Sequence, residues 1–212
     1  MWVSEAVAAH GVCLLLWAKS RMSVPLFFPR TRASHLKLTT INKATIRPEC
    51  SVDIAAIRQV NNAAFPTPAE GQLVDALRAA GRLSISLVAE HDGATVGHVA
   101  FSPVTLDGHA DLRGGLGLAP VAVVPQFQAQ GIGGRLIREA LSVATAARCT
   151  FVVVLGEPAY YTRFGFVPAT RFGLQNEYGV GDEFMALELQ AGSLARRAGL
   201  IRYAPEFATL TT

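Results

Sequence analysis

The chain has 212 residues, of which 50% are hydrophobic and 17% charged, and this composition excludes a disordered polypeptide and predicts a folded domain with a core of its own. The net charge of +3 is unevenly distributed: residues 1–43 hold six of the 19 Lys and Arg residues but only one of the 16 acids. The remainder is slightly acidic, so nucleic-acid binding is not expected of it. The three scattered cysteines (Cys13, Cys50, Cys149) form neither a disulfide framework nor a metal-binding pattern. A cytoplasmic protein without a metal is therefore expected.

The first 43 residues are set apart from the fold. Their apolar run, "VCLLLWA", is about seven residues long, whereas a membrane-spanning helix needs about 20, so no membrane association is expected. A signal peptide is disfavoured because no basic residue precedes this run. The basic, acid-poor composition resembles a transit peptide, and an unstructured extension or a true start at Met22 are the simpler interpretations. We expect a disordered leader over residues 1–43 and one domain over residues 44–212.

The first half of this domain predicts a strand, two amphipathic helices and a hairpin, over residues 44–48, 51–65, 69–81 and 84–106. Ser51 is the expected N-cap of the first helix, and Gly81 ends the second. Asp92-Gly93 is typical of a two-residue hairpin turn, because both residues tolerate positive φ.

The second half predicts a polar loop, a buried strand, a helix, a second buried strand, a short helix, a late strand and a C-terminal helix, over residues 107–115, 115–124, 131–146, 150–156, 158–165, 183–189 and 191–207. Since one helix joins the two buried strands, they form a βαβ unit and lie parallel in the middle of the sheet. The predicted fold is therefore mixed α/β, with a central mixed sheet and flanking helices.

A glycine-rich turn, "QAQGIGG" (128–134), lies between the first buried strand and its helix. Glycine lets the backbone turn tightly and approach a ligand, and the first N–H groups of a helix attract anions, so this segment predicts a phosphate cradle. A dinucleotide fingerprint is excluded because Leu136 occupies the place of its third glycine. A Walker A loop is excluded because all lysines lie within residues 1–43. The pattern that fits is Gln/Arg-x-x-Gly-x-Gly/Ala, with Gln128, Gly131 and Gly133 at its fixed positions.

This pattern resembles the acetyl-CoA pyrophosphate loop of the GNAT superfamily of N-acetyltransferases. Downstream, "PAYYTRFGF" (158–166) is similar to a short helix of that family, whose tyrosine stands four residues before a Gly-Phe pair. Here the tyrosine is Tyr161 and the pair is Gly165-Phe166. Wider segments such as "SLVAEHDGATVGHVAFSPV" and "DEFMALEL" resemble its YhbS-like bacterial branch. The resemblance covers roughly residues 44–205.

The resemblance implies a GNAT-type sheet whose parallel strand pair splays apart around acetyl-CoA, the co-substrate. The pantetheine would pair with the backbone of Val121, Ala122 and Val123. The pyrophosphate would be held by the amides of Gln128, Ala129, Gln130, Gly131, Ile132, Gly133 and Gly134. Many relatives have glycine in place of Ala129, so the loop is expected to differ slightly in shape, because alanine does not adopt positive φ comfortably.

Acetyl transfer to an amine requires an oxyanion donor, a base for the ammonium and an acid for the departing thiolate. A peptide N–H near Val123 is expected to polarise the thioester carbonyl. Tyr161 is the candidate acid, because a phenol with a pKa near 10 can protonate a thiolate as it leaves.

The base is less clear, because many relatives place a carboxylate on the strand just before the cofactor contacts and residues 116–122 contain none. Glu157, beside the helix of Tyr161, is kept as the candidate. Glu70, Glu90 and His98 stay open, and a core position is the simpler interpretation of His98.

The predicted function is acetyl-CoA-dependent N-acetyl transfer to a primary amine of a small molecule or a protein, without nucleic acid, membrane or metal. The alternative is a non-catalytic acyl-CoA-binding sensor, which Tyr161 disfavours and the missing strand carboxylate keeps open. The binding site for the acceptor is expected to be formed by residues 51–80, 107–115 and 171–183. A homodimer formed through the C-terminal segment is left open.

Overall fold

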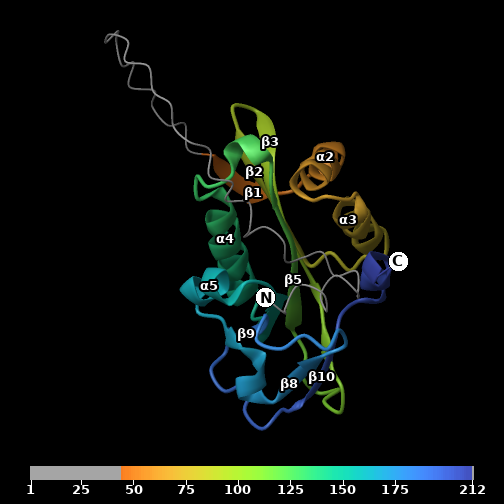
Figure 1. Ribbon diagram of the computed structural model, residues 1–212, viewed down its shortest axis with the longest axis vertical. Coiled ribbons are helices and arrows are strands. Elements are labelled where there is room, and N and C mark those ends of the chain that lie inside the picture. The colour runs from red at the N-terminus through yellow and green to blue at the C-terminus, as the bar shows by residue number, and fades with distance from the viewer. Residues whose placement is uncertain (1–43, 212) are drawn as a thin grey trace, which may run out of the picture.

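The computed structural model describes residues 44–211, and these follow the predicted order of elements as far as β6 and α5 (Figure 1). The leader predicted over residues 1–43 lies outside the described residues. The strands are β1 (Thr45–Pro48), β2 (Ile85–His91), β3 (Ala94–Pro103), β4 (Thr105–Leu106), β5 (Gly115–Val123), β6 (Phe151–Leu155), β7 (Val167–Pro168), β8 (Leu174–Asn176), β9 (Phe184–Glu188) and β10 (Gly199–Arg202). The helices are α2 (Ile54–Ala64), α3 (Ala69–Ala79), α4 (Ile132–Ala146) and α5 (Pro158–Tyr161). Five 3-10 segments join them: η2 (Ser51–Asp53), η3 (Pro125–Phe127), η4 (Thr162–Phe164), η5 (Ala169–Phe172) and η6 (Pro205–Thr211).

The main sheet has seven strands in the order β1-β2-β3-β5-β6-β9-β7. Its neighbours pair antiparallel except for β5 and β6, which are parallel as the βαβ unit predicts. The hairpin between β2 and β3 turns at Asp92 and Gly93, which both have positive φ, at 50° and 76°. A second sheet of three strands, β4-β10-β8, packs below the main sheet in Figure 1.

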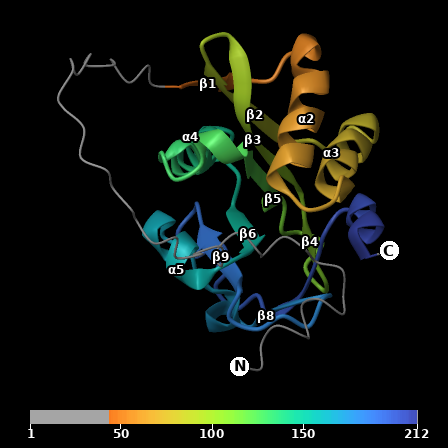
Figure 2. The ribbon, with the colours of Figure 1, turned by 45° about the horizontal axis from the view of Figure 1, so that its top comes forward.

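Helix α4 covers one face of the main sheet, and α2 and α3 cover the other (Figures 1 and 2). Buried strand β6 shows this division clearly, because its side chains alternate between the faces. Val152 and Val154 pack in the cluster of α4, whereas Val153 and Leu155 pack in the cluster of α3 and the second sheet. A continuous apolar run is therefore required in β6, as the sequence suggested.

The N-cap prediction for the first helix was wrong. Ser51 is exposed, and the backbone N–H and the thiol of Cys50 both donate to the Asp53 carboxylate, at 2.8 and 3.0 Å. The same carboxylate accepts from Arg47 at 2.6 and 2.9 Å. Because Asp53 satisfies these donors, a 3-10 turn precedes α2 and replaces a serine cap.

The helix predicted over residues 191–207 was also wrong. Gly192 and Arg196 adopt positive φ, at 78° and 60°, which a continuous helix does not allow. Strand β10 follows and pairs parallel with β8 and antiparallel with β4. In the part of the chain that the structure describes, no helix is long and apolar enough to cross a membrane.

Candidate active site

The parallel pair β5–β6 separates part-way along its length. The pairing runs from Gly115–Phe151 to Gly117–Val153, while β5 continues alone on this side to Val123. A cavity of about 480 Å³ opens at the separation. Val121 and Ile132 line it on the face of the main sheet that α4 covers. Ala119 and Leu155 line it on the opposite face, which α2 and α3 cover. The cavity therefore passes through the sheet, and its two ends present different surfaces.

The backbone of Val123 faces the side where the strands separate. Val124 donates its N–H to the carbonyl of Val96 on β3, at 3.0 Å. Antiparallel pairs alternate between hydrogen-bonded and non-bonded positions, so the Val123–Gly97 pair directs its N–H and C=O groups away from each other. The Val123 carbonyl accepts from Nε2 of Gln128, at 2.8 Å. Gln128 thus braces the start of the loop with its side chain, and the Val123 N–H is directed to the cavity side.

The glycine-rich turn leads directly into α4. Gly131 is the N-cap, with φ 82°, and the first helical hydrogen bond runs from the Arg135 N–H to the Gly131 carbonyl, at 3.1 Å. The N–H groups of Ile132, Gly133 and Gly134 therefore have no partner within the helix, and all three residues line the cavity. The helix dipole adds to the pull of these donors on an anion.

Ala129 takes the left-handed conformation itself, with φ 59°. The loop therefore keeps a positive φ at this position, although alanine was expected to avoid it. Glycine would adopt the same conformation at a lower free-energy cost.

Tyr160 and Tyr161 both line the cavity, from α5. The Tyr161 ring lies against Gly156, where any Cβ would overlap the ring, and contacts Phe166 edge to face at 5.8 Å between centroids. Burial raises the pKa of the Tyr161 hydroxyl above its usual value of 10, so the phenol is protonated at neutral pH. The Tyr160 hydroxyl lies 3.2 Å from the point that a Cβ of Gly133 would occupy.

Most of the predicted site residues come together around the cavity. Those that line it are Val121, Val123, Gln128, Ala129, Gly131, Ile132, Gly133, Gly134, Glu157 and Tyr161. Ala122 does not, because it lies opposite His98 on β3 and its buried side chain points to the other face of the strand. Gln130 does not, because it is exposed and donates to the Gln126 carbonyl at 3.0 Å.

The candidate bases lie in different surroundings. Glu157 is exposed at the cavity rim. Its backbone carbonyl accepts from the N–H groups of Tyr160 and Tyr161, at 2.9 and 3.2 Å. Glu90 lies on β2 and accepts from Arg47 at 2.9 and 3.0 Å. Glu70 is 1% exposed, its Oε2 has no hydrogen-bond partner among the described residues, and burial raises the pKa of its carboxyl. Of these three carboxylates, only Glu157 lines the cavity.

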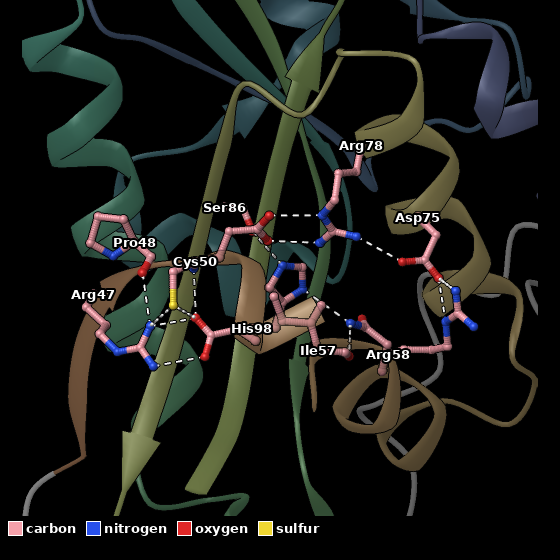
Figure 3. A network of polar contacts seen from close by, with 12 residues as sticks. Arg47, Pro48, Cys50, Ile57, Arg58, Asp75, Arg78, Ser86 and His98 are labelled. Carbon is pink, nitrogen blue, oxygen red and sulfur yellow. Dashed lines mark hydrogen bonds and ion pairs between the residues drawn. The ribbon is translucent and has the colours of Figure 1, made fainter. Parts of the chain in front are cut away.

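His98 belongs to a buried polar network between the sheet and helices α2 and α3 (Figure 3). Its Nδ1 lies 3.2 Å from Nδ2 of Asn61, and its Nε2 lies 2.9 Å from the hydroxyl of Ser86. Ser86 in turn donates to Glu49, which accepts from Arg78 twice, at 2.9 Å. Burial lowers the pKa of His98 to about 3, so the ring is neutral and holds the network together, away from the cavity.

The far end of the cavity contains residues that the sequence did not single out. They are apolar: Ala64, Phe65, Ala119 and Leu155. The expected acceptor segments 107–115 and 171–183 do not line it, because they lead into or join the three-stranded sheet. Asp107 and Asp111 there form ion pairs with Arg202 and Arg197, at 3.0 and 2.9 Å. Within residues 44–211, no group of three or more His, Cys, Asp and Glu side chains could hold a metal ion.

Comparison with known proteins agrees with this geometry. The sequence pattern of the acetyltransferase (GNAT) domain matches residues 82–168. The uncharacterized N-acetyltransferase YhbS of Escherichia coli is 37% identical over 164 residues, which cover 76% of this chain and 97% of that protein. This chain belongs to the GNAT acetyltransferase family.

Two solved structures of this family share the fold. E. coli YhbS in complex with CoA has a TM-score of 0.74 and 33% identity, over 84% of this chain and 96% of that one. A GNAT acetyltransferase from Brucella melitensis in complex with acetyl-CoA has a TM-score of 0.65 and 40% identity, over 78% of this chain and 99% of that one. The predicted GNAT-type mixed sheet with a splayed parallel pair is therefore confirmed, and the chain is an N-acetyltransferase by family.

Proposed function

We propose that this GNAT acetyltransferase transfers the acetyl group of acetyl-CoA to a primary amine of a small molecule or a protein. The observation that carries the proposal is the cavity that passes through the sheet between β5 and β6. One end offers three helix N–H groups without helical partners, suited to a pyrophosphate, and the other is an apolar chamber suited to an acceptor. The reaction takes place between these ends, where Val123 and Tyr161 meet the cavity.

The cofactor would lie along the edge of β5 that β6 leaves. The N–H groups of residues 132–134 would bind the pyrophosphate, and the free backbone edge of Val121 and Val123 would pair with the pantetheine amides. Complexes of YhbS with CoA and of the Brucella protein with acetyl-CoA support this ligand.

In the reaction itself, the amine nitrogen attacks the thioester carbonyl and forms the new C–N bond. The Val123 N–H would stabilise the oxyanion of the tetrahedral intermediate. As the intermediate collapses, the C–S bond breaks and the thiolate takes the proton of the Tyr161 hydroxyl. Burial raises the pKa of this phenol, so the hydroxyl still carries its proton when the thiolate forms.

Glu157 is proposed as the group that accepts the ammonium proton before attack. It is the carboxylate that lines the cavity, and its exposed position at the rim suits transfer through water. The apolar chamber formed by Ala64, Phe65 and Leu155 favours an amine attached to an apolar group over a polycation. A polycation would lose its hydration there without carboxylates to replace it.

The first experiment is calorimetric titration of the protein with acetyl-CoA and, separately, with NAD and ATP. We expect micromolar binding of acetyl-CoA alone. Gly133→Val should weaken it at least tenfold, because the new side chain crowds the Tyr160 hydroxyl and covers the cradle. Gly181→Val is the matched control, since a side chain at Gly181 meets open space, and it should bind as the wild type does. Absence of acetyl-CoA binding would refute the proposal.

Turnover is tested by thiol release with a panel of apolar amines and polyamines. Tyr161→Phe keeps the ring against Gly156 and removes only the hydroxyl, so we expect kcat to fall about 100-fold with little change in the KM for acetyl-CoA. Tyr160→Phe is the control and should retain most of kcat. Binding without thiol release from any amine would instead favour the non-catalytic sensor.

A further inference from the structure

The lysines of this chain all precede its first strand. Residues 44–212 hold 13 of the 19 Lys and Arg residues, and each of these 13 is arginine. The three lysines are Lys19, Lys37 and Lys43. Lysine is among the commonest residues of soluble proteins, so its confinement to the first 43 residues is a marked feature of the sequence.

Lysine and arginine differ in the reaction proposed above. A lysine side chain is a primary amine, which becomes a nucleophile when it loses its proton. A guanidinium does not lose its proton in a protein, because its pKa lies above about 12. The domain around the cavity therefore carries no side-chain amine of its own, and the side-chain amines of this chain are joined to that domain through β1.

The start of β1 lies within a short distance of the cavity. Strand β1 is three steps from β5 in the main sheet, because β2 and β3 lie between them, and neighbouring strands are about 4.8 Å apart. Thr45 is in register with Glu90, which is in register with Thr95. Gly97, two residues further along β3, is in register with Val123. These registers place Thr45 about 16 Å from Val123, where the thioester is proposed to react.

Chain length decides which lysine can cover this distance. A polypeptide extends by at most about 3.5 Å per residue, and a lysine side chain adds about 6 Å. Lys37 precedes Thr45 by eight residues, so its amine has a maximum reach of about 34 Å. Lys43 precedes Thr45 by two residues and has a maximum reach of about 13 Å. Lys37 can therefore meet the reaction centre of its own molecule, whereas Lys43 cannot.

The neighbours of Lys37 also suit the apolar end of the cavity. Leu36 and Leu38 flank it on both sides. Lys19 is distant enough to reach the cavity as well, but Arg21 stands two residues away and would bring a second positive charge into the apolar chamber. Among the three lysines, Lys37 combines a sufficient reach with an apolar environment.

We propose that Lys37 accepts the acetyl group within the same molecule, so that the protein modifies its own N-terminal segment. This inference rests on the proposed function, of which it names one substrate. The Lys37 Nζ, once its proton has passed to Glu157, attacks the thioester carbonyl and forms the C–N bond. The C–S bond then breaks and the thiolate takes the Tyr161 proton. The products are coenzyme A and an acetylated Lys37 that has lost its positive charge.

The test incubates the full chain with acetyl-CoA and no added amine, and follows each lysine by peptide mass spectrometry. We expect Lys37 to be acetylated at least tenfold faster than Lys43, with a rate constant that does not change when the protein is diluted tenfold. Tyr161→Phe should slow the modification of Lys37 about 100-fold, as it slows turnover. A spontaneous reaction with acetyl-CoA would be equally fast in this variant and would not distinguish the two lysines.

Lys37→Arg keeps the charge and removes the amine, so incorporation of a labelled acetyl group should lose most of its wild-type value. Lys43→Arg is the matched control and should incorporate as much label as the wild type. Equal acetylation of the two lysines, an unchanged rate in Tyr161→Phe, or a rate constant that rises with protein concentration would overturn the inference. Thiol release with added amines but without modified Lys37 would also overturn it and leave the proposed function intact. Absence of thiol release with any amine would count against the proposed function itself.

Discussion

Two polar regions of this molecule lie only a few strands apart and are built on opposite plans. In the network of Figure 3, each charged group faces a partner: Glu49 accepts from Arg78 and Ser86, and both ring nitrogens of His98 are within hydrogen-bond distance of neighbours. At the cavity, the N–H groups of residues 132–134 have no helical partners, and the guanidinium of Arg163 forms no ion pair among the described residues.

The difference separates polar groups that stabilise the fold from polar groups that are available to a ligand. A donor that faces a filled partner contributes to folding, whereas a donor that faces open space contributes only when something binds. Burial without a partner does not mark a binding group by itself. The Tyr203 hydroxyl and Oε2 of Glu70 are buried and without partners among residues 44–211, yet neither residue lines the cavity. The useful sign is an unpaired donor that also reaches the cavity.

The largest effect expected from this contrast is on stability, at the network. Arg78→Met leaves the half-buried Glu49 carboxylate without its charged partner, so the free energy of unfolding should fall by about 2–3 kcal/mol. The affinity for acetyl-CoA should not change, because the network lies outside the cavity. Chemical denaturation and calorimetric titration of the same samples measure the two quantities.

Arg58→Met provides the matched control. Arg58 pairs with Asp75, as Arg78 does, but its side chain is 59% exposed against 19% for Arg78. Its loss should cost less than about 0.5 kcal/mol. If both variants lost the same stability, or if Arg78→Met also lost acetyl-CoA affinity, the division between the two regions would be wrong.

The next effect is a dependence of stability on pH that arises at His98. Its pKa is about 3 in the folded protein, where burial disfavours the charged form, against an ordinary value of 6.5 when unfolded. A lowered pKa stabilises the fold above pH 6.5, and this contribution is lost as the pH falls from 6.5 toward 3. The free energy of unfolding at pH 5 should therefore lie about 2 kcal/mol below its value at pH 7.

The interval between pH 7 and pH 5 suits this measurement, because the pKa values of the Glu49 and Asp53 carboxyls are lowered below their usual 4.5 and 3.8 and these groups act only in stronger acid. His98→Gln keeps a polar side chain that does not titrate. The fall in the free energy of unfolding between pH 7 and pH 5 should therefore be about 2 kcal/mol smaller in this variant than in the wild type. An equal pH dependence in both proteins would show that His98 is not the source.

Local signals in the sequence were sufficient for the elements that depend on neighbours in the chain. The turn at Asp92 and Gly93, the parallel pair β5–β6 and the glycine-rich turn that starts α4 all follow from short patterns with a direct physical cause. Strand β10 was mistaken for a helix because its structure depends on β8 and β4, which lie far away in the sequence. Its short apolar segment does not decide between the two conformations by itself.

The site was predictable to the same extent. The loop and the Tyr161 helix each lie within one short segment, so their motifs could be recognised. The apolar end of the cavity joins Phe65 of the α2–α3 connection to Ala119 and Leu155 on two strands, and only the tertiary fold brings these together. The choice among the carboxylates has the same origin, because the sequence cannot tell that Glu70 is buried while Glu157 lies on the rim.

The smallest effect tests whether the open region also carries a cost in stability. Ala129 has φ 59°, a conformation that costs a residue with a Cβ about 1 kcal/mol more than glycine. Ala129→Gly should therefore raise the free energy of unfolding by about 0.5–1 kcal/mol, despite the greater freedom of glycine in the unfolded chain. The matched control, Ala55→Gly, replaces an exposed residue within helix α2 and should lower it by a similar amount. Because the loop keeps its shape, the KM for acetyl-CoA should stay within about twofold of the wild type. A higher free energy of unfolding for Ala129→Gly, together with a lower one for Ala55→Gly, would locate the strain in the loop. A lower free energy of unfolding for both variants would show that the left-handed turn costs nothing there.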